Sequence, residues 1–253
     1  MRIILSPAKK MVCDPDAPKA QSLPFFLGRT ERLLERLKAM TPAELQALWA
    51  CNDRIAALNV ERLAHMDLRR ALTPAVLSYD GIAYTRMAPQ VFTRDEEEYV
   101  AERLRILSGF YGLLRPMDGV TPYRLEMQAK LAVDGAKDLY DFWGDALAKR
   151  LEAETDTIVN LASKEYARAV LGHISAGTRV LTCAFCETKG AKVIEKATLC
   201  KMARGEMVRF MAENRVERLE DIRSFDRYGF AYDRGRSDEN TCVFVREGGK
   251  KHA

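Results

Sequence analysis

The densest group of chemically capable side chains lies in one irregular stretch, residues 104–127, with the sequence LRILSGFYGLLRPMDGVTPYRLEM. Arg115, Asp118, Arg124 and Glu126 stand there among glycines and prolines. Loops held on a rigid scaffold are where binding and catalytic groups collect. An ordinary turn tied down by ion pairs explains the same residues equally well. This stretch is the first place to look for a functional site.

Two further pairs combine a nucleophile with a base or an acid. Ser6 and Lys9 follow the apolar residues 3–5, and Ser163 and Tyr166 stand at the start of a predicted helix. A serine becomes a useful nucleophile beside a group that takes its proton, and a fixed cation stabilises the anion that develops. Lys9 and Lys10 also suit a phosphate or carboxylate, although a solvated basic pair has the same sequence context. Nothing in the sequence shows that these groups meet.

A basic helix is predicted over residues 199–215. Its apolar residues recur at about 100° per residue, whereas Lys201, Arg204 and Arg215 fall on the opposite side and Arg209 at the flank. Such a face can hold phosphates, and a solvated face has the same pattern. The net charge of +4 is spread along the chain, so folding must assemble any concentrated anion-binding surface.

Several common chemistries lack their signature. The chain has no phosphate-binding glycine loop, dinucleotide fingerprint, nucleophile elbow or zinc-protease motif. It has three histidines, and Cys183 and Cys186 have no second cysteine or histidine pair beside them, so we expect no metal ion and no cofactor. The six cysteines are interpreted as reduced thiols, with Cys183 and Cys186 on opposite faces of a strand. Without a run of 18 apolar residues or a signal peptide, the sequence favours a cytoplasmic protein and predicts no membrane span.

The elements that must position these groups form a mixture. Capping boxes at Thr41 and Thr93 mark two helix starts, and the second helix is predicted to reach Leu107. Residues 76–87 are interpreted as two extended pieces broken at Asp80-Gly81. Strands are predicted at residues 3–5, 157–161, 179–185, 228–233 and 241–246.

This mixture predicts a mixed α/β (α+β) fold. We expect a single compact domain over residues 1–247, with a mixed sheet surrounded by helices, and a disordered tail at 248–253. The order of the elements does not alternate cleanly enough to predict a doubly wound sheet.

Ser108 to Gly112 admits a second interpretation, as the turn of a helix-hairpin-helix unit. In that unit, hairpin amides and the following helix N-terminus hold a backbone phosphate without reading bases. Glycine would let the chain turn tightly and approach the phosphate. The glycines are three residues apart, and Pro116 shortens any second helix, so the match to this motif is partial.

Taken together, the chain resembles the YaaA family of bacterial peroxide-stress proteins. The matching pieces occur in order over nearly the whole sequence: Ser6-Pro-Ala-Lys9, Asp80-Gly81 with Tyr84, residues 104–127, DLYDFWGD at 138–145, NLAS-x-EY at 160–166, and K-x-ARG, RF and ENR between Lys201 and Arg215. The resemblance implies one unusual mixed α/β domain with a basic cleft and a helix-hairpin-helix element. It also implies a cytoplasmic role against hydrogen peroxide, limiting iron-driven damage to DNA. Family members are reported to bind DNA, with an interest in irregular or unpaired duplexes, and no enzymatic activity is settled for them.

The first functional hypothesis is therefore a stress protein that binds DNA without sequence preference. The family motifs map its cleft onto Lys9, Gly109, Gly112, Arg115, Arg124, Lys201, Arg204 and Arg209. Tyr111, Tyr123 or Trp143 would stack on exposed bases. Met202 stands where relatives can carry a basic residue, which thins the basic face of the helix. A monomer is favoured.

The alternative is an enzyme that acts on a nucleotide or nucleobase-like substrate. Glu126 would serve as general acid or base, and Lys9 or Arg115 would stabilise a developing anion. The residues assigned to this site are Ser6, Lys9, Arg115, Glu126, Ser163 and Tyr166. Their convergence in one deep pocket would favour the enzyme, and wide separation would count against it.

Overall fold

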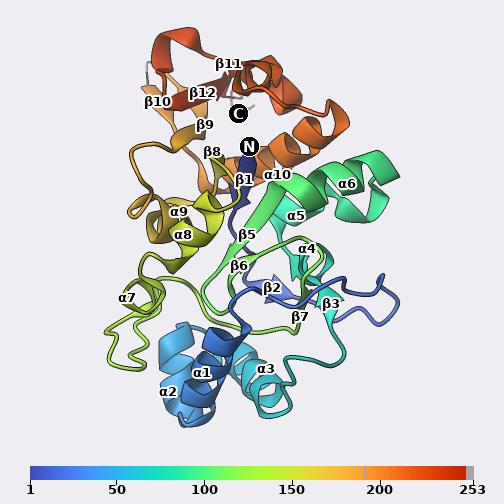
Figure 1. Cartoon of the computed structure of the whole chain (residues 1–253). Helices are drawn as coiled ribbons and strands as arrows, with labels where there is room; N and C mark the ends of the chain where they lie inside the picture. The colour runs from blue at the N-terminus through green and yellow to red at the C-terminus, as the bar shows by residue number, and fades with distance from the viewer. Residues whose placement is uncertain (191, 249–253) are drawn as a thin grey trace, which may run out of the picture.

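A twisted mixed sheet runs through the molecule (Figure 1). The computed structural model describes residues 1–190 and 192–248. Eight strands of this described part form the sheet in the order β11-β12-β9-β8-β1-β5-β6, with β10 paired to β9. Their bounds are β1 Arg2–Leu5, β5 Leu104–Ser108, β6 Gly112–Leu114, β8 Thr157–Leu161, β9 Arg179–Lys189, β10 Lys192–Ile194, β11 Ala231–Tyr232 and β12 Thr241–Arg246.

The centre of the sheet is parallel. Strand β1 lies between β5 and β8 and runs parallel to both, and the parallel pairing continues from β8 to β9 and from β9 to β12. Ile3, Ile4 and Leu5 are completely or almost completely buried, which is why β1 reads as an unbroken apolar run. Parallel strands end at a common edge, so the residues that follow β1 and β8 emerge side by side.

Helices cover the sheet and extend the molecule beyond it. The first three form a separate group at the bottom of Figure 1. Gly205 lets the helix over residues 197–213 approach the helix over residues 82–87, because a Cβ at Gly205 would lie 1.9 Å from the carbonyl oxygen of Ala83. The α-helices are α1 Leu27–Lys38, α2 Pro42–Trp49, α3 Asp53–Ala64, α4 Ala75–Ser78, α5 Ile82–Met87, α6 Arg94–Arg103, α7 Leu139–Trp143, α8 Ala146–Glu152, α9 Lys164–Leu171 and α10 Ala197–Glu213.

Two small antiparallel pairs and four short 3-10 helices complete the described elements. They are β2 Lys10–Met11 with β4 Tyr79–Asp80, β3 Thr73–Pro74 with β7 Gly119–Val120, η1 Pro89–Val91, η2 Leu219–Ser224, η3 Arg227–Gly229 and η4 Arg234–Arg236. The buried apolar side chains form one core cluster. Within the described ranges, no helix combines the length and apolar character needed to cross a membrane.

The mixed α/β fold class is confirmed, as are both capping boxes, at Thr41 and Thr93. The predicted strand at residues 241–246 is β12, and a short piece of the predicted 228–233 strand is β11. The predicted tail falls mostly on residues 249–253, which lie outside the described residues; Gly248 donates its N–H to the Thr188 hydroxyl at 2.9 Å.

The predicted helix over residues 94–107 is wrong beyond Arg103. From Leu104 the chain is strand β5, paired with β1. Leu104, Ile106 and Leu107 are all fully buried, and a helix would turn some of them away from the core. Tertiary pairing therefore outweighs the helical pattern that the capping box begins.

The helix-hairpin-helix interpretation of Ser108 to Gly112 is also wrong. The stretch is a β-hairpin, in which Ser108 of β5 pairs with Gly112 of β6. Gly112 has φ +76°, where glycine costs little. The Ser108 hydroxyl accepts the Tyr111 N–H at 2.8 Å, which closes the turn.

Residues 76–87 differ from the prediction as well. Two extended pieces were expected, but only Tyr79 and Asp80 are extended, as β4, between helices α4 and α5. The predicted break at Gly81 is the start of α5. A Cβ at Gly81 would lie 2.7 Å from the Ala8 Cβ, so this glycine lets α5 meet the segment after β1.

Candidate functional site

Two serines meet at the carboxyl edge of the parallel strands. Ser6 follows β1, and Ser163 comes two residues after β8. The Ser163 N–H donates to the Ser6 hydroxyl at 2.8 Å, and that hydroxyl donates to the Ser163 hydroxyl at 3.1 Å. The Tyr84 hydroxyl donates to the Ser6 carbonyl at 3.1 Å. The parallel register thus brings together two residues 157 positions apart in sequence.

A cavity of about 350 Å³ opens over these serines. We call it the serine pocket. Its volume lies in the range of small-molecule sites. Helices α5, α9 and α10 and the segment after β1 contribute to its walls, which are Leu5, Ser6, Pro7, Ala8, Lys9, Lys10, Asp80, Gly81, Ile82, Ala83, Tyr84, Glu126, Leu161, Ser163, Glu165, Tyr166, Lys201 and Arg204.

Two carboxylates of the pocket have different surroundings. Glu126 is held by Lys9 Nζ at 2.7 Å and by the Arg124 guanidinium at 3.0 Å. Glu165 is held by one N–H, from Gln128 at 3.2 Å. Burial raises the pKa of Glu165, and the neighbouring Glu126 carboxylate raises that pKa further. A buried carboxyl group whose pKa is raised is suited to a proton-transfer role.

Two cations of the pocket lack a carboxylate partner. Lys10 pairs with Asp80 and Lys9 with Glu126. Lys201 and Arg204, on α10, form no ion pair within the described chain. The Arg204 Nε is buried and finds no hydrogen-bond partner there, and burial lowers the pKa of this guanidinium. A desolvated cation without a partner is costly, so Arg204 favours an anion from outside the chain. Lys201, which is exposed, adds a second positive charge to the same pocket.

Tyrosines form the interior beside the pocket. The Tyr123 hydroxyl lies 2.6 Å from the Ser108 hydroxyl and 3.0 Å from that of Tyr79. Burial raises the pKa of Tyr123 to about 12 and raises the pKa of Tyr166 further still. Both phenols therefore keep their protons at neutral pH, and Tyr166, on the pocket wall, can act as a fixed donor.

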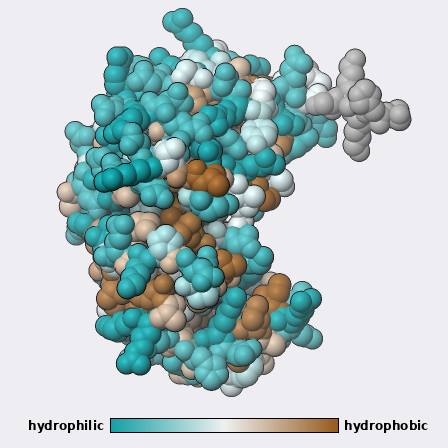
Figure 2. All heavy atoms as spheres, turned by 90° about the vertical axis from the view of Figure 1, so that its right-hand side faces the viewer, coloured by the Kyte–Doolittle hydropathy of each residue, from teal (hydrophilic) through white to brown (hydrophobic). Residues whose placement is uncertain are grey.

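A larger hollow of about 590 Å³ adjoins the serine pocket. We call it the helical hollow, because α2 forms one of its sides. Figure 2 shows the molecule deeply notched at mid-height, between its upper and lower parts. The hollow is lined by Lys9, Met40, Glu44, Ala47, Leu48, Trp49, Ala50, Arg124, Glu126, Gln128, Ala129 and Lys130.

The residues predicted for an enzyme site largely converge. Ser6, Lys9, Glu126, Ser163 and Tyr166 all line the serine pocket. Arg115 is the exception among them. Its Nε donates to Asp118 at 2.9 Å, its guanidinium reaches the Leu23 carbonyl, and the group lies over the Phe25 ring. These contacts make it a structural residue outside the pocket.

The residues predicted for DNA contact separate into two groups. Lys9, Lys201 and Arg204 line the serine pocket, and Arg124 lines the helical hollow. Arg209 does not join them, since it pairs with Glu213 at 2.7 Å, and Arg115 pairs with Asp118.

Gly109 and Gly112 are buried, so they cannot hold a phosphate in the way the sequence suggested. A Cβ at Gly109 would lie 2.6 Å from the Leu125 carbonyl oxygen, and one at Gly112 would lie 2.8 Å from the Trp143 ring. Both glycines serve close packing. Tyr111, Tyr123 and Trp143 are also buried and are not available to stack on bases.

The cysteines keep the interpretation made from sequence. Cys183 is buried, and Cys186 is partly exposed on the other face of β9; both are free thiols. In the part of the chain that the structure describes, no three histidine, cysteine or acidic side chains gather as a metal site would require.

Sequence reasoning missed Asp80, Tyr84 and Glu165 as members of the site, whereas Lys10 was expected to meet a phosphate or carboxylate and lines the pocket. Tyr84 and Glu165 belong to two of the quoted family motifs, and Asp80 opens one of them. The motifs therefore carried a signal. The missing information was the packing of α5 and α9 against the end of β1, which local patterns do not contain.

The fold and site define a mixed α/β protein with a pocket lined by several cations at the carboxyl edge of its parallel strands. The family model described as peroxide stress protein YaaA matches residues 1–236. A UPF0246 protein of Lachnoclostridium phytofermentans is 51% identical over 97% of this chain and 96% of its own length. UPF0246 proteins of Agathobacter rectalis and Lactiplantibacillus plantarum are 50% and 47% identical, over 98% and 97% of this chain and 99% of each relative. The chain belongs to the peroxide stress protein YaaA family.

Proposed function

We propose that this protein acts in the cytoplasm against hydrogen peroxide by binding DNA at the serine pocket and the surface around it, limiting iron-driven damage. The main support for DNA binding is that Lys201 and Arg204 line the pocket without a carboxylate partner in the described chain. Phosphate is the anion that DNA offers, and it dominates the affinity of proteins that do not read sequence. Family membership supports the peroxide-stress role.

The size of the pocket restricts what enters it. A cavity of about 350 Å³ holds a small-molecule-sized group, whereas a duplex is far wider. A phosphate or a single unstacked nucleotide fits, while paired segments would remain outside. DNA with unpaired positions is therefore the expected ligand.

A salt series tests this proposal. Labelled duplex, bubble and single-stranded DNA would be titrated with the wild type and with Lys201→Gln plus Arg204→Gln. We expect roughly a tenfold or greater loss of affinity and a salt slope smaller by about one to two, because up to two phosphate contacts disappear.

The matched control removes the same charge elsewhere. Arg94 and Arg218 have side chains that are 89% and 72% exposed, and their double change to glutamine should leave affinity nearly unaltered. Equal losses in both double variants would show that only net charge matters, and would overturn the pocket as the DNA site.

A second candidate function is an enzyme acting on a nucleotide or nucleobase-like substrate. The convergence of Ser6, Ser163, Glu126 and Tyr166 favours it, because phosphate binding alone does not require these groups. Glu165 would be the proton donor or acceptor, since its carboxyl is the one less engaged by cations.

Incubation of the protein with nucleotide mixtures, followed by mass spectrometry, tests the enzyme. A product made by the wild type and lost in Glu165→Gln, with substrate affinity retained, would support it. Unchanged product formation in Glu165→Gln and in Ser163→Ala would remove these residues from the chemistry.

A further inference from the structure

The serine pocket and the helical hollow share a wall. Lys9 and Glu126 line both cavities. A third cavity, of about 10 Å³, lies between the same segments, lined by residues 7–9, 123–126 and Tyr166. The Lys9–Glu126 ion pair therefore divides the two larger spaces. Because the Lys9 side chain is 62% exposed, the top of this wall is a side chain that can move aside.

Each cavity contains an arginine with unused donor capacity. Arg204 in the serine pocket and Arg124 in the helical hollow each have a buried Nε without a hydrogen-bond partner among the described residues. Lys201 on one side and Lys130 on the other are exposed and form no ion pair there. Each cavity thus has an arginine and a lysine on its wall, and Arg124 shares its charge with Glu126 at 3.0 Å.

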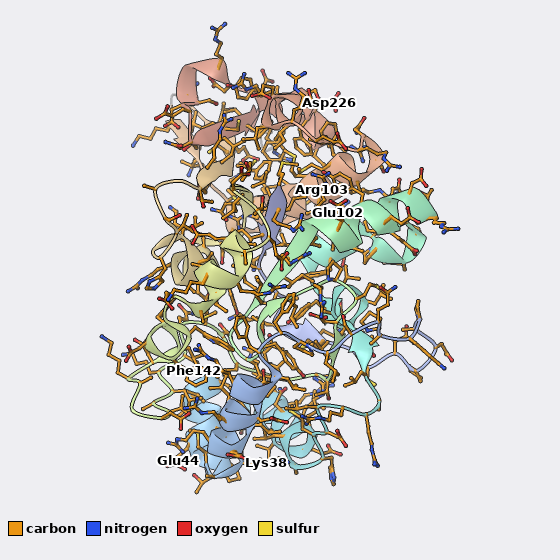
Figure 3. All side chains as sticks on the ribbon, viewed as in Figure 1. Lys38, Glu44, Glu102, Arg103, Phe142 and Asp226 are labelled. Carbon is orange, nitrogen blue, oxygen red and sulfur yellow. The ribbon has the colours of Figure 1, made fainter. Side chains whose placement is uncertain are left out.

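Both cavities also have apolar walls. In the helical hollow, Met40, Leu48 and the Trp49 ring stand opposite the 128–130 segment. In the serine pocket, Ile82 and Leu161 contribute. The acidic residue Glu44 lies on α2 at the bottom of the molecule (Figure 3) and belongs to the hollow's lining. Apolar walls with a few fixed charges suit a flat group that carries a phosphate.

We propose that the serine pocket and the helical hollow are two halves of one site, which binds two consecutive nucleotides of an unpaired strand across the Lys9–Glu126 wall. The proposal rests on DNA binding as proposed above and adds the length of the segment and its path. One nucleotide occupies the serine pocket, with phosphate near Lys201 and Arg204. Its neighbour occupies the helical hollow, with phosphate near Arg124 and Lys130.

A mononucleotide and a dinucleotide separate the two halves. Thymidine 5′-monophosphate and 5′-phosphorylated dithymidylate would be titrated by calorimetry. We expect the dinucleotide to bind at least about tenfold more tightly, the gain typical of one further base contact. Equal affinities would overturn the proposal.

A variant that fills the hollow provides the second measurement. Ala47 lies on the exposed side of α2 and lines the hollow, and Ala43, one turn earlier, is exposed and does not. Ala47→Trp should cost the dinucleotide most of its advantage and leave the mononucleotide unchanged. Ala43→Trp should leave both affinities as in the wild type. A dinucleotide that binds Ala47→Trp as tightly as wild type would contradict the two-part site.

A third variant removes the competing carboxylate. Glu126→Gln frees Lys9 and Arg124 and should strengthen dinucleotide binding several-fold. If Ala47→Trp leaves dinucleotide affinity unchanged while the affinity for long DNA still depends on Lys201 and Arg204, only the two-part site is contradicted. If no ligand depends on Lys201 and Arg204, the proposed function fails with it.

Discussion

Strand β1 has a group of cations at each end, and the two groups differ in whether their buried arginine contacts a carboxylate. At the amino end, the Glu154 carboxylate accepts hydrogen bonds from Arg2 at 3.0 Å and from Arg105 at 2.8 Å, and it forms an ion pair with Arg150 at 3.0 Å. Its side chain and that of Arg105 are 8% and 6% exposed. At the carboxyl end, Arg204 and Lys201 face the serine pocket without a carboxylate partner within the described residues.

The difference separates a cluster of paired arginines from a pocket whose arginine has no carboxylate partner among the described residues. Burial alone would raise the pKa of Glu154, but hydrogen bonds from Arg2 and Arg105 outweigh it and lower that pKa. Those arginines contact a carboxylate within the chain, although the Arg150 Nε and one Glu154 oxygen have no hydrogen-bond partner among the described residues. Arg204 is desolvated and has no carboxylate partner there, and an exogenous anion would supply one. The same residue type thus pairs with a carboxylate at one end of β1 and faces a cavity at the other.

The largest effect on stability is expected at Glu154, at the amino end of β1. Glu154→Gln should lower the free energy of unfolding by about 3 kcal/mol, because it leaves buried guanidinium groups unpaired. The folded pKa of Glu154 lies below its ordinary value of 4.5, so its stabilisation is present above that pH and is lost as the pH falls through the folded pKa. Urea titrations at neutral and acid pH measure both the loss of unfolding free energy and its dependence on pH. Glu61→Gln, on the exposed side of α3, is the control; an equally small change in both variants would remove the distinction.

A smaller effect on stability, of opposite sign, is expected at Arg204, at the carboxyl end of β1. Arg204→Met keeps the length of the side chain and removes an uncompensated charge, so the free energy of unfolding should stay the same or rise by up to about 1 kcal/mol. DNA affinity should fall in the same variant. A loss of more than about 2 kcal/mol, measured by urea titration, would make Arg204 a structural residue and end the comparison.

The third prediction concerns pH within the pocket. The pKa of Glu165 is higher in the folded chain than its ordinary 4.5, so the folded state binds more protons just above that pH. Its contribution to stability therefore falls as the pH rises through this interval. Glu165→Gln should flatten the dependence of the melting temperature on pH there and slightly raise stability at pH 7. An unchanged pH profile would show that Glu165 titrates as an ordinary surface carboxyl.

The smallest effect is expected at the exposed rim. Lys10 and Asp80 form an ion pair in which the lysine side chain is 74% exposed and the aspartate side chain 38% exposed. Lys10→Ala should change the free energy of unfolding by less than about 0.5 kcal/mol, because exposed pairs gain little over hydration. A thermal melt checks this, and a large loss would place Lys10 with the structural arginines.

Local sequence determined much of the secondary structure. The capping boxes at Thr41 and Thr93 begin α2 and α6, and the 3.6-residue period marks α10. The apolar run at residues 3–5 is a strand as predicted. These features depend on neighbours within one or two turns, which a sequence pattern contains. Five residues of the enzyme hypothesis, Ser6, Lys9, Glu126, Ser163 and Tyr166, line one pocket, whereas Arg115 lies outside it.

Tertiary structure decided what local patterns left open. Leu104 to Leu107 suits a helix or a strand, and pairing with β1 selects the strand. Arg115 and Arg209 resemble Arg204 in sequence, but Asp118 and Glu213 neutralise them in the fold. Ser6 and Ser163 meet because β1 and β8 are parallel and end at one edge. Which charges remain unpaired, and which side chains share a pocket, depend on contacts between distant segments, and for that reason only the folded chain defines the site.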